Sequence, residues 1–223
     1  MQAPPVIVRA LHADERAFAT THDPGFARGR QVTLRRLGRS PQLAAAVIQL
    51  APAERDDVLA RRDLERLAAK SPPLKARIRV RRAPHAAKLR AWYGQAQRRF
   101  HVRWQLLAAV NFVESAFGKV ENASTAGAQG PMQFLPATWR AYGLGGDVHD
   151  PHDAILGAAN YLRRNGATHD ERAALYRYNH SSLYVDAVLH YAHRITHVPD
   201  ALAEYYAWDV YVRTPTGERR YRP

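Results

Sequence analysis

The fold is decided by residues 110–139, whose sequence is VNFVESAFGKVENASTAGAQGPMQFLPATW. The stretch begins inside a predicted helix, residues 104–117. Apolar residues and one acid recur there at intervals of three and four, at Leu107, Val110, Val113, Glu114 and Phe117. This spacing places side chains on one helix face, so Glu114 lies on an apolar stripe. A Gly-rich turn, residues 127–134, follows. The arrangement predicts an enzyme built around one acid.

Glu114 is a candidate general acid. Burial among apolar side chains would disfavour the charged carboxylate and raise its pKa, so that the group could hold a proton near neutral pH and release it. The alternative is a glutamate at the helix edge that reaches solvent or pairs with an arginine. The residues that follow favour the acid.

Several short motifs follow one another in a fixed order. They are Glu114-Ser115, Ser124, GAQGPMQ at 127–133, PATW at 136–139, AANYL at 158–162 and Tyr178-Asn179. Together they cover roughly residues 87 to 195, about half of the chain. In order and spacing they resemble the lytic transglycosylase and goose-type lysozyme superfamily, whose enzymes cut the glycan strands of bacterial peptidoglycan.

The resemblance implies an all-α, lysozyme-like domain with a substrate groove. It implies that Glu114 is the catalytic acid and that Tyr178 stands beside it. It also implies sugar sites lined by Ser115, Ser124, Met132, Gln133, Tyr161 and Asn179. Pro131 departs from the family pattern, in which an aliphatic residue is common, and proline has no backbone N–H to offer a substrate.

A second catalytic carboxylate is hard to find in the sequence. Most glycosidases use two acids, but Glu121 precedes a polar turn, and Asp150 and Asp153 fit a helix cap. The resemblance implies a one-acid mechanism, in which the glutamate protonates the glycosidic oxygen and then removes the proton of the sugar's 6-hydroxyl to close a 1,6-anhydro ring. Two alternatives stay open. One is a muramidase that uses Asp147 or Asp150, and the other is a non-catalytic wall-binding or nucleic-acid-binding module.

The net charge of +13 is spread unevenly along the 223 residues. Residues 1–104 hold 22 Lys/Arg against 8 Asp/Glu, whereas residues 105–197 hold 7 against 8. Such a basic segment favours an anionic polymer, and in a wall enzyme that polymer carries carboxylates and phosphates. A solvated basic surface without a specific partner is the alternative. Nucleic acid is disfavoured, because residues 27–91 contain no aromatic residue on which bases could stack.

Cofactors, metals and membrane spans are not predicted. The chain has no cysteine. His190, His193 and His197 share a helix face but lack an acidic partner in the sequence, so zinc is not predicted. Asp147, Asp150 and Asp153 supply few oxygen ligands for calcium. No apolar run is long enough to span a membrane. The N-terminus lacks the apolar core of a signal peptide, so we expect a cell-envelope or secreted enzyme whose signal is removed or whose export follows another route.

Three regions are expected. Residues 1–83 form a basic, partly helical extension whose first 40 residues are a partly ordered arm, with helices between residues 41 and 69 and a break at 71–73. Residues 84–197 form the lysozyme-like catalytic domain, with helices at 86–100, 104–117, from 136, 151–165, 170–178 and 182–196. Residues 198–223 form a C-terminal extension with a β-hairpin around residues 214–217. The fold class is therefore all-α with one short hairpin.

Overall fold

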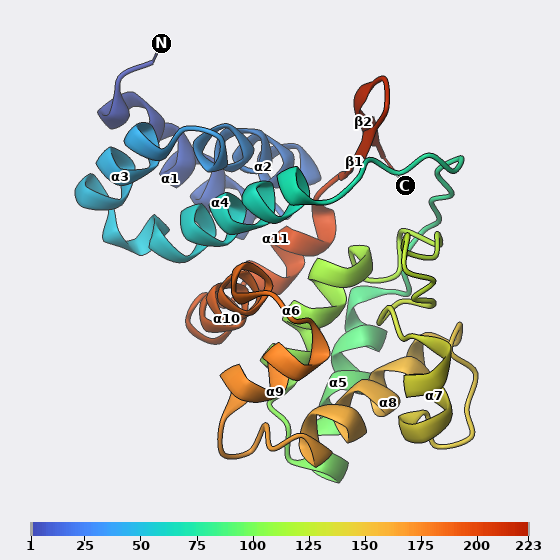
Figure 1. Cartoon of the computed structure of the whole chain (residues 1–223). Helices are drawn as coiled ribbons and strands as arrows, with labels where there is room; N and C mark the ends of the chain where they lie inside the picture. Colours follow the sequence, from blue (N-terminus) through green and yellow to red (C-terminus); the bar gives the residue numbers. More distant parts are fainter. Residues whose placement is uncertain (1, 223) are drawn as a thin grey trace. The chain divides into compact units, whose positions relative to one another are not determined.

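The structure is a computed structural model that describes residues 2–222. These residues form eleven α-helices, one 3-10 turn and one two-stranded antiparallel hairpin (Figure 1). The predicted all-α architecture with a C-terminal hairpin is confirmed. Among the described residues, no helix is both long and apolar enough to cross a membrane.

The chain forms two compact units, each built from two separate segments. The first unit comprises the residues up to Pro72 together with Ser182–Trp208. The second comprises Pro73–Ser181 together with the residues from Asp209 onward. The helix at 182–197 therefore groups with the N-terminal helices, whereas the sequence-based boundaries at residues 83 and 197 place it with the central segment.

The first unit is a helical bundle. Its elements are α1 (Pro4–Thr21), α2 (Pro24–Gly38), α3 (Pro41–Leu50), η1 (Pro52–Glu54), α4 (Arg55–Lys70), α10 (Ser182–His197) and α11 (Ala201–Ala207). The helices α1, α2 and α3 each begin at a proline, whose fixed φ suits the first helical position and whose missing N–H would have no partner there. The most extensive packing joins α4 to α10.

The prediction of a partly ordered arm over residues 1–40 is wrong, because α1 and α2 occupy most of it. Its prolines begin helices, and Asp23 caps α2 by accepting a hydrogen bond from the Gly25 N–H. The buried face of α2 contains polar residues, Arg30 and Gln31 among them. These polar residues hide the apolar period that normally reveals an amphipathic helix.

A network of buried charges joins the helices of the first unit. The Arg30 guanidinium lies 2.6 Å from Asp57, 2.7 Å from Glu54 and 2.9 Å from Glu204. Arg194 pairs with Asp57, with Glu15 and, at 3.4 Å, with Glu204. Four carboxylates thus share two guanidinium groups. Burial raises the pKa of Glu204 to about 7, with a further contribution from the charge of Asp57.

We expect this network to make the first unit more stable at pH 5 than at pH 8. A carboxylate whose folded pKa exceeds its unfolded value of 4.5 stabilises the fold below the unfolded pKa and loses that contribution as the pH rises through about 7. The difference should be on the order of 3 kcal/mol. Denaturant unfolding of wild type and Glu204→Gln at both pH values measures it, because glutamine keeps the shape without the charge.

The control for this experiment is His12→Gln. His12 lies 3.4 Å from Glu54, a carboxylate of the same network. A pH dependence that persists in Glu204→Gln and disappears in His12→Gln would assign the effect to the histidine and contradict the prediction.

The second unit contains the remaining helices and the hairpin. Its elements are α5 (Ala86–Phe100), α6 (Trp104–Ser115), α7 (Pro136–Tyr142), α8 (Pro151–Arg164), α9 (Glu171–Tyr178), β1 (Val210–Thr214) and β2 (Gly217–Tyr221). Five consecutive residues of α6, 106–110, are fully buried, and α8 buries all of residues 154–160. The helix α8 packs against α5, α6, α7 and α9, so it contacts every other helix of this unit.

Small residues dock α7 onto α8. The Trp139 indole lies so close to Gly143 and Gly157 that a Cβ added at either glycine would come within 2.6 Å of it. The Trp139 Nε1–H donates to the Gly146 carbonyl oxygen at 3.2 Å. The position of α7 therefore depends on two residues without side chains.

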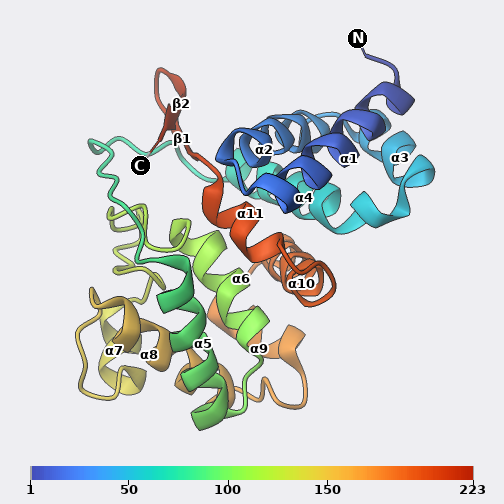
Figure 2. The same cartoon turned by 180° about the vertical axis from the view of Figure 1, so that it is seen from behind.

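Residues 73–82, the connecting segment, run in an extended conformation past the hairpin and on toward α5 (Figure 2). At one end the Leu74 N–H donates to the Arg213 carbonyl oxygen in β1 at 3.0 Å. At the other end Val80 forms an antiparallel bridge with Val120, just after α6. The connecting segment is thus fastened at both ends within the second unit.

Candidate active site

Glu114 lies in the last turn of α6 and is half-buried. The predicted helix to Phe117 is two residues too long, because Ala116 and Phe117 have φ values of 51° and 67°. Non-glycine residues seldom adopt this left-handed conformation, and sharp chain reversals of this kind occur often at functional sites. The helix therefore ends directly after Glu114-Ser115.

Hydrogen bonds anchor the turn at 130–133 to the end of α6. The Ser115 hydroxyl donates to the Pro131 carbonyl oxygen at 2.6 Å, and the Asn111 side-chain amide donates to the same oxygen at 2.8 Å. The Tyr93 hydroxyl in α5 donates to the Asn111 side-chain oxygen at 2.6 Å. Ser115 is only 2% exposed, so its hydroxyl positions the turn. The prediction that Ser115 lines a sugar site has no support in this position.

Gly130 allows this turn to form. Its φ is +73°, and a Cβ added there would lie 1.9 Å from the Val148 carbonyl oxygen. Gln129 and Phe134 pair at the base of the turn, where their backbone groups exchange hydrogen bonds of 2.8 and 2.9 Å. Gln133 is held with φ at +49°, and its side-chain amide donates to the Gly130 carbonyl oxygen at 2.9 Å. The turn therefore presents Gln133 in a fixed orientation.

Tyr178 reaches the same turn from the end of α9. Its hydroxyl donates to the Met132 carbonyl oxygen at 2.6 Å. Burial raises the pKa of Tyr178 well above its ordinary value, and the negative charge of Glu114 raises that pKa further. The turn at 130–133 links the two residues, because Ser115, next to Glu114, binds the Pro131 carbonyl oxygen and Tyr178 binds that of Met132. The ring of Tyr178 also makes an edge contact with Tyr161 at a centroid distance of 5.3 Å.

A pocket of about 290 Å³ opens beside Tyr178. Its lining residues are Gln133, Phe134, Leu135, Thr138, Tyr161, Arg177, Tyr178 and His180. Aromatic faces next to hydroxyl, amide and guanidinium groups suit a sugar, which offers both apolar faces and hydroxyl groups. Phe134 is the centre of the aromatic cluster, with edge contacts to Trp139, Tyr161 and Tyr178.

The structure brings only part of the predicted site set together. Gln133, Tyr161 and Tyr178 line the pocket, but Glu114 is not among its lining residues. The Met132 side chain is fully buried, so Met132 offers its carbonyl group rather than its thioether.

Two further predicted residues, Ser124 and Asn179, form hydrogen bonds with backbone groups. The Ser124 hydroxyl accepts hydrogen bonds from the N–H groups of Ala126 and Ala128 and closes an exposed loop. Asn179 ends α9, and its N–H donates to the Leu175 carbonyl oxygen.

Three lining residues of the pocket were not predicted from the sequence: Leu135, Arg177 and His180. Leu135 is 46% exposed although it is large and apolar. Arg177 and His180 flank the Tyr178-Asn179 motif in the sequence, so extending that motif by one residue on each side would have found both.

The acids that a second catalytic role would need are engaged elsewhere. Asp147 accepts a hydrogen bond from the His149 N–H, and Asp150 accepts from the N–H groups of His152 and Asp153. Neither lines the pocket beside Tyr178. The predicted capping role of Asp150 at the start of α8 is confirmed.

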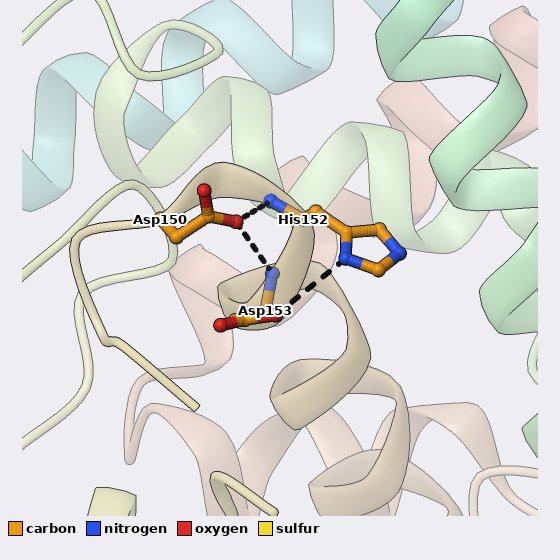
Figure 3. Close-up of side chains that lie close together, drawn as sticks. All are labelled: Asp150, His152 and Asp153. Atoms are coloured by element: carbon orange, nitrogen blue, oxygen red, sulfur yellow. Dashed lines mark hydrogen bonds and ion pairs between the residues drawn. The ribbon is translucent and has the colours of Figure 1, made fainter. Parts of the chain in front are cut away.

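Asp150, His152 and Asp153 form the one group within residues 2–222 whose possible metal-ligand atoms all lie within 4.8 Å of one another (Figure 3). The figure shows that the Asp150 carboxylate points to the start of α8, where it caps the helix. Asp153 accepts from the Asp147 N–H at 3.0 Å, and the His152 ring contacts Gln95 at 3.0 Å. Because these interactions account for the arrangement, the cluster is read as a helix cap.

The histidines of α10 have an acidic partner, contrary to the prediction. Asp56 of α4 places one carboxylate oxygen 2.8 Å from His190 and the other 2.5 Å from His193. His197 lies one turn further and contacts the His193 carbonyl oxygen. The sequence could not reveal this partner, since Asp56 and His190 are 134 residues apart. The arrangement joins two helices of the first unit.

Comparison with known proteins identifies the central part of the chain. Residues 92–194 match the family model described as a transglycosylase SLT domain. The match lies inside the predicted catalytic region and includes Glu114, the turn at 130–133 and Tyr178. The lysozyme-like, helical character of such domains agrees with the fold. No curated protein and no solved structure significantly matches the chain.

Proposed function

Because residues 92–194 belong to the transglycosylase SLT family, we propose that the protein is a peptidoglycan lytic transglycosylase. Its substrate is the β-1,4 bond between N-acetylmuramic acid and N-acetylglucosamine. Its products carry 1,6-anhydro ends. The observation that supports this proposal is one half-buried carboxylic acid, Glu114, at the end of α6, whose charge acts on Tyr178 in a pocket lined by aromatic and polar groups.

Glu114 performs both proton transfers in this mechanism. As an acid it gives its proton to the glycosidic oxygen, and the bond from that oxygen to the anomeric carbon breaks. As a carboxylate it then takes the proton of the 6-hydroxyl, whose oxygen attacks the anomeric carbon and closes the ring. The proton that leaves the hydroxyl restores the acid. No water enters the products.

Tyr178 and Gln133 hold the site in shape around this acid. The hydroxyl of Tyr178 fixes the Met132 carbonyl group, while Gln133 faces the pocket from the same turn. A turn held from both α6 and α9 keeps the sugar and the acid in register, which is how positioning groups lower a barrier. Tyr161 extends the aromatic wall along which a sugar ring can lie.

The alternative is a muramidase that hydrolyses the same bond with water. It needs a second acid in the cleft, and Asp147 and Asp150 are the two that the sequence offered. Both accept hydrogen bonds from backbone N–H groups of their own loop and helix start, which favours the one-acid mechanism. A non-catalytic binding module is disfavoured, since it would not need an acid at this position.

The products distinguish these functions. We expect digestion of purified peptidoglycan in heavy-oxygen water to give anhydro ends that carry no heavy oxygen, measured by mass spectrometry. Hydrolysis would give reducing ends that are heavier by one water and contain the label. A digest with labelled reducing ends only would replace the proposal with the muramidase, and the absence of any cleavage would favour the binding module.

We also propose that the enzyme acts in the cell envelope and adsorbs to an anionic wall polymer through its basic residues. The supporting observation is the charge distribution, since the excess lies outside residues 105–197. Fixed positive charge near a cleavage site raises the local concentration of a polyanion and depends on salt. No cofactor is required for the proposed chemistry.

A further inference from the structure

Basic residues are dense in two short segments of the second unit. The connecting segment (residues 73–82) and the hairpin segment (residues 209–222) together hold nine Lys/Arg against two Asp/Glu. Their net charge is +7, more than half of the +13 of the whole chain, within 24 of its 223 residues. The two segments therefore carry a high density of positive charge.

Many arginines of the first unit are neutralised by neighbours. Arg30 is buried and paired, and several others bind carboxylates of the same bundle: Arg35, Arg39, Arg61, Arg62 and Arg66. In contrast, five exposed cations of the two basic segments form no ion pair within residues 2–222: Lys75, Arg77, Arg79, Arg82 and Arg219. The excess of basic residues counted in residues 1–104 is therefore larger than the positive charge that the helical bundle can offer to a polyanion.

Backbone hydrogen bonds hold the connecting segment in place, and one of them joins it to the hairpin segment. Leu74 donates to the Arg213 carbonyl oxygen of β1. Arg79 accepts from the Glu121 N–H at 3.1 Å, and the Arg81 N–H donates to the Lys119 carbonyl oxygen at 2.9 Å. The Asn122 side chain adds bonds to the backbone of Arg77 and Arg79. The cations are therefore presented on a fixed, extended backbone.

The connecting segment ends at a second pocket, of about 250 Å³. Its lining residues are Arg81, Gly118, Val120, Glu121, Gly130, Pro131 and His149. Gly130 and Pro131 belong to the turn that also carries Met132 and Gln133. The row of cations thus leads from the hairpin to the turn that borders the proposed cleavage site.

We propose that the connecting segment and the hairpin form one docking surface for an anionic wall polymer, which holds the glycan strand at the turn beside Glu114. The polymer carries carboxylates or phosphates, the groups that arginine binds with two parallel hydrogen bonds. The choice of a wall polymer rests on the proposed function. The assignment of binding to these two segments does not rest on it, because that assignment follows from the charges and contacts of the second unit.

Three sets of substitutions test the surface. The connecting-segment variant is Arg77→Gln, Arg79→Gln and Arg82→Gln, and the hairpin variant is Arg213→Gln and Arg219→Gln. Arg81, Arg220 and Arg222 stay unchanged, since Arg81 lines a pocket and the other two pair with the buried Asp209. The matched control removes three exposed arginines of α1 and α4, through Arg9→Gln, Arg16→Gln and Arg55→Gln.

Binding is measured by sedimentation with purified sacculi over a salt series. Both surface variants should bind sacculi more weakly than wild type, and the connecting-segment variant by roughly tenfold. The slope of the logarithm of the binding constant against the logarithm of the salt concentration should fall in magnitude by roughly one for each lost ionic contact. The control variant should bind like wild type. Turnover on a short soluble glycan fragment should not change in any variant. If wild type lacked turnover, the proposed function would fail while the binding result still stood.

Three outcomes would contradict the proposed docking surface. If the hairpin variant bound sacculi as tightly as wild type, the hairpin would not be part of the docking surface. If the control variant lost as much affinity as the surface variants, net charge alone would determine binding. Duplex DNA that displaces the protein from sacculi and binds it more tightly would assign the surface to nucleic acid. Sacculi stripped of phosphate-linked polymers identify the anion, since retained binding assigns carboxylates and lost binding assigns phosphates, and both agree with the proposal.

Discussion

Replacing Glu114 with glutamine is expected to lower cleavage of peptidoglycan by at least about a hundredfold, the usual contribution of a general acid. Glutamine keeps the size of the side chain but has no proton to give to the leaving oxygen and cannot accept one from the 6-hydroxyl. The half-buried position at the end of α6 leaves the fold intact. Turnover on purified peptidoglycan, together with the melting temperature, measures the effect.

Tyr178→Phe is the companion variant in that experiment. It removes the hydroxyl that binds the Met132 carbonyl oxygen, so it should lower the stability by about 1 kcal/mol and lower turnover less than Glu114→Gln does. A Glu114→Gln enzyme with near-normal turnover would remove Glu114 from the catalytic role. A rate in Tyr178→Phe as low as in Glu114→Gln would mean that the hydroxyl itself takes part in the reaction.

Gly130→Ala is expected to destabilise the second unit by about 3 kcal/mol or more, a range reached when a substitution forces the backbone to move. The added methyl group would lie 1.9 Å from the Val148 carbonyl oxygen, and the residue would keep a φ of +73° that alanine disfavours. The turn that carries Met132 and Gln133 would have to shift, so cleavage should fall as well. Denaturant unfolding measures the stability.

Gly127→Ala is the matched control for this prediction. Its φ is +81°, but nothing lies within 4 Å of an added Cβ. Only the backbone conformation is penalised there, which costs about 1 to 2 kcal/mol. Equal destabilisation by the two substitutions would mean that the close approach of Val148 relaxes without loss, contrary to the expectation.

The sequence predicted the helices of the central region well, because their patterns are strong. Asp150-Pro151 marks a helix start, and a helix begins at Pro151. The hairpin was also predicted, and β1 and β2 flank Pro215 and Thr216 as expected. These are local signals, which short-range physics decides.

The sequence could not predict arrangements that depend on distant partners. Arg30 was one of the residues counted in the basic excess of residues 1–104, yet it is buried between carboxylates of other elements. Ser115 was assigned to the substrate, yet its hydroxyl is used by Pro131. In both cases the residue type agrees with either role, and only the position of the partner decides between them.

The order of the two units along the chain has a consequence for protein synthesis. The ion pair between Asp56 of α4 and His190 of α10 joins residues that are 134 positions apart in the sequence. Glu204 is synthesised 174 residues after its partner Arg30. A ribosome adds 5 to 20 residues per second, so the N-terminal helices exist for on the order of ten seconds before their partner helix emerges. During that interval α4 lacks the packing of α10, and Arg30 has Glu54 and Asp57 as partners but lacks Glu204. The nascent chain therefore has to keep an incomplete bundle from aggregating until the entire second-unit core has been translated.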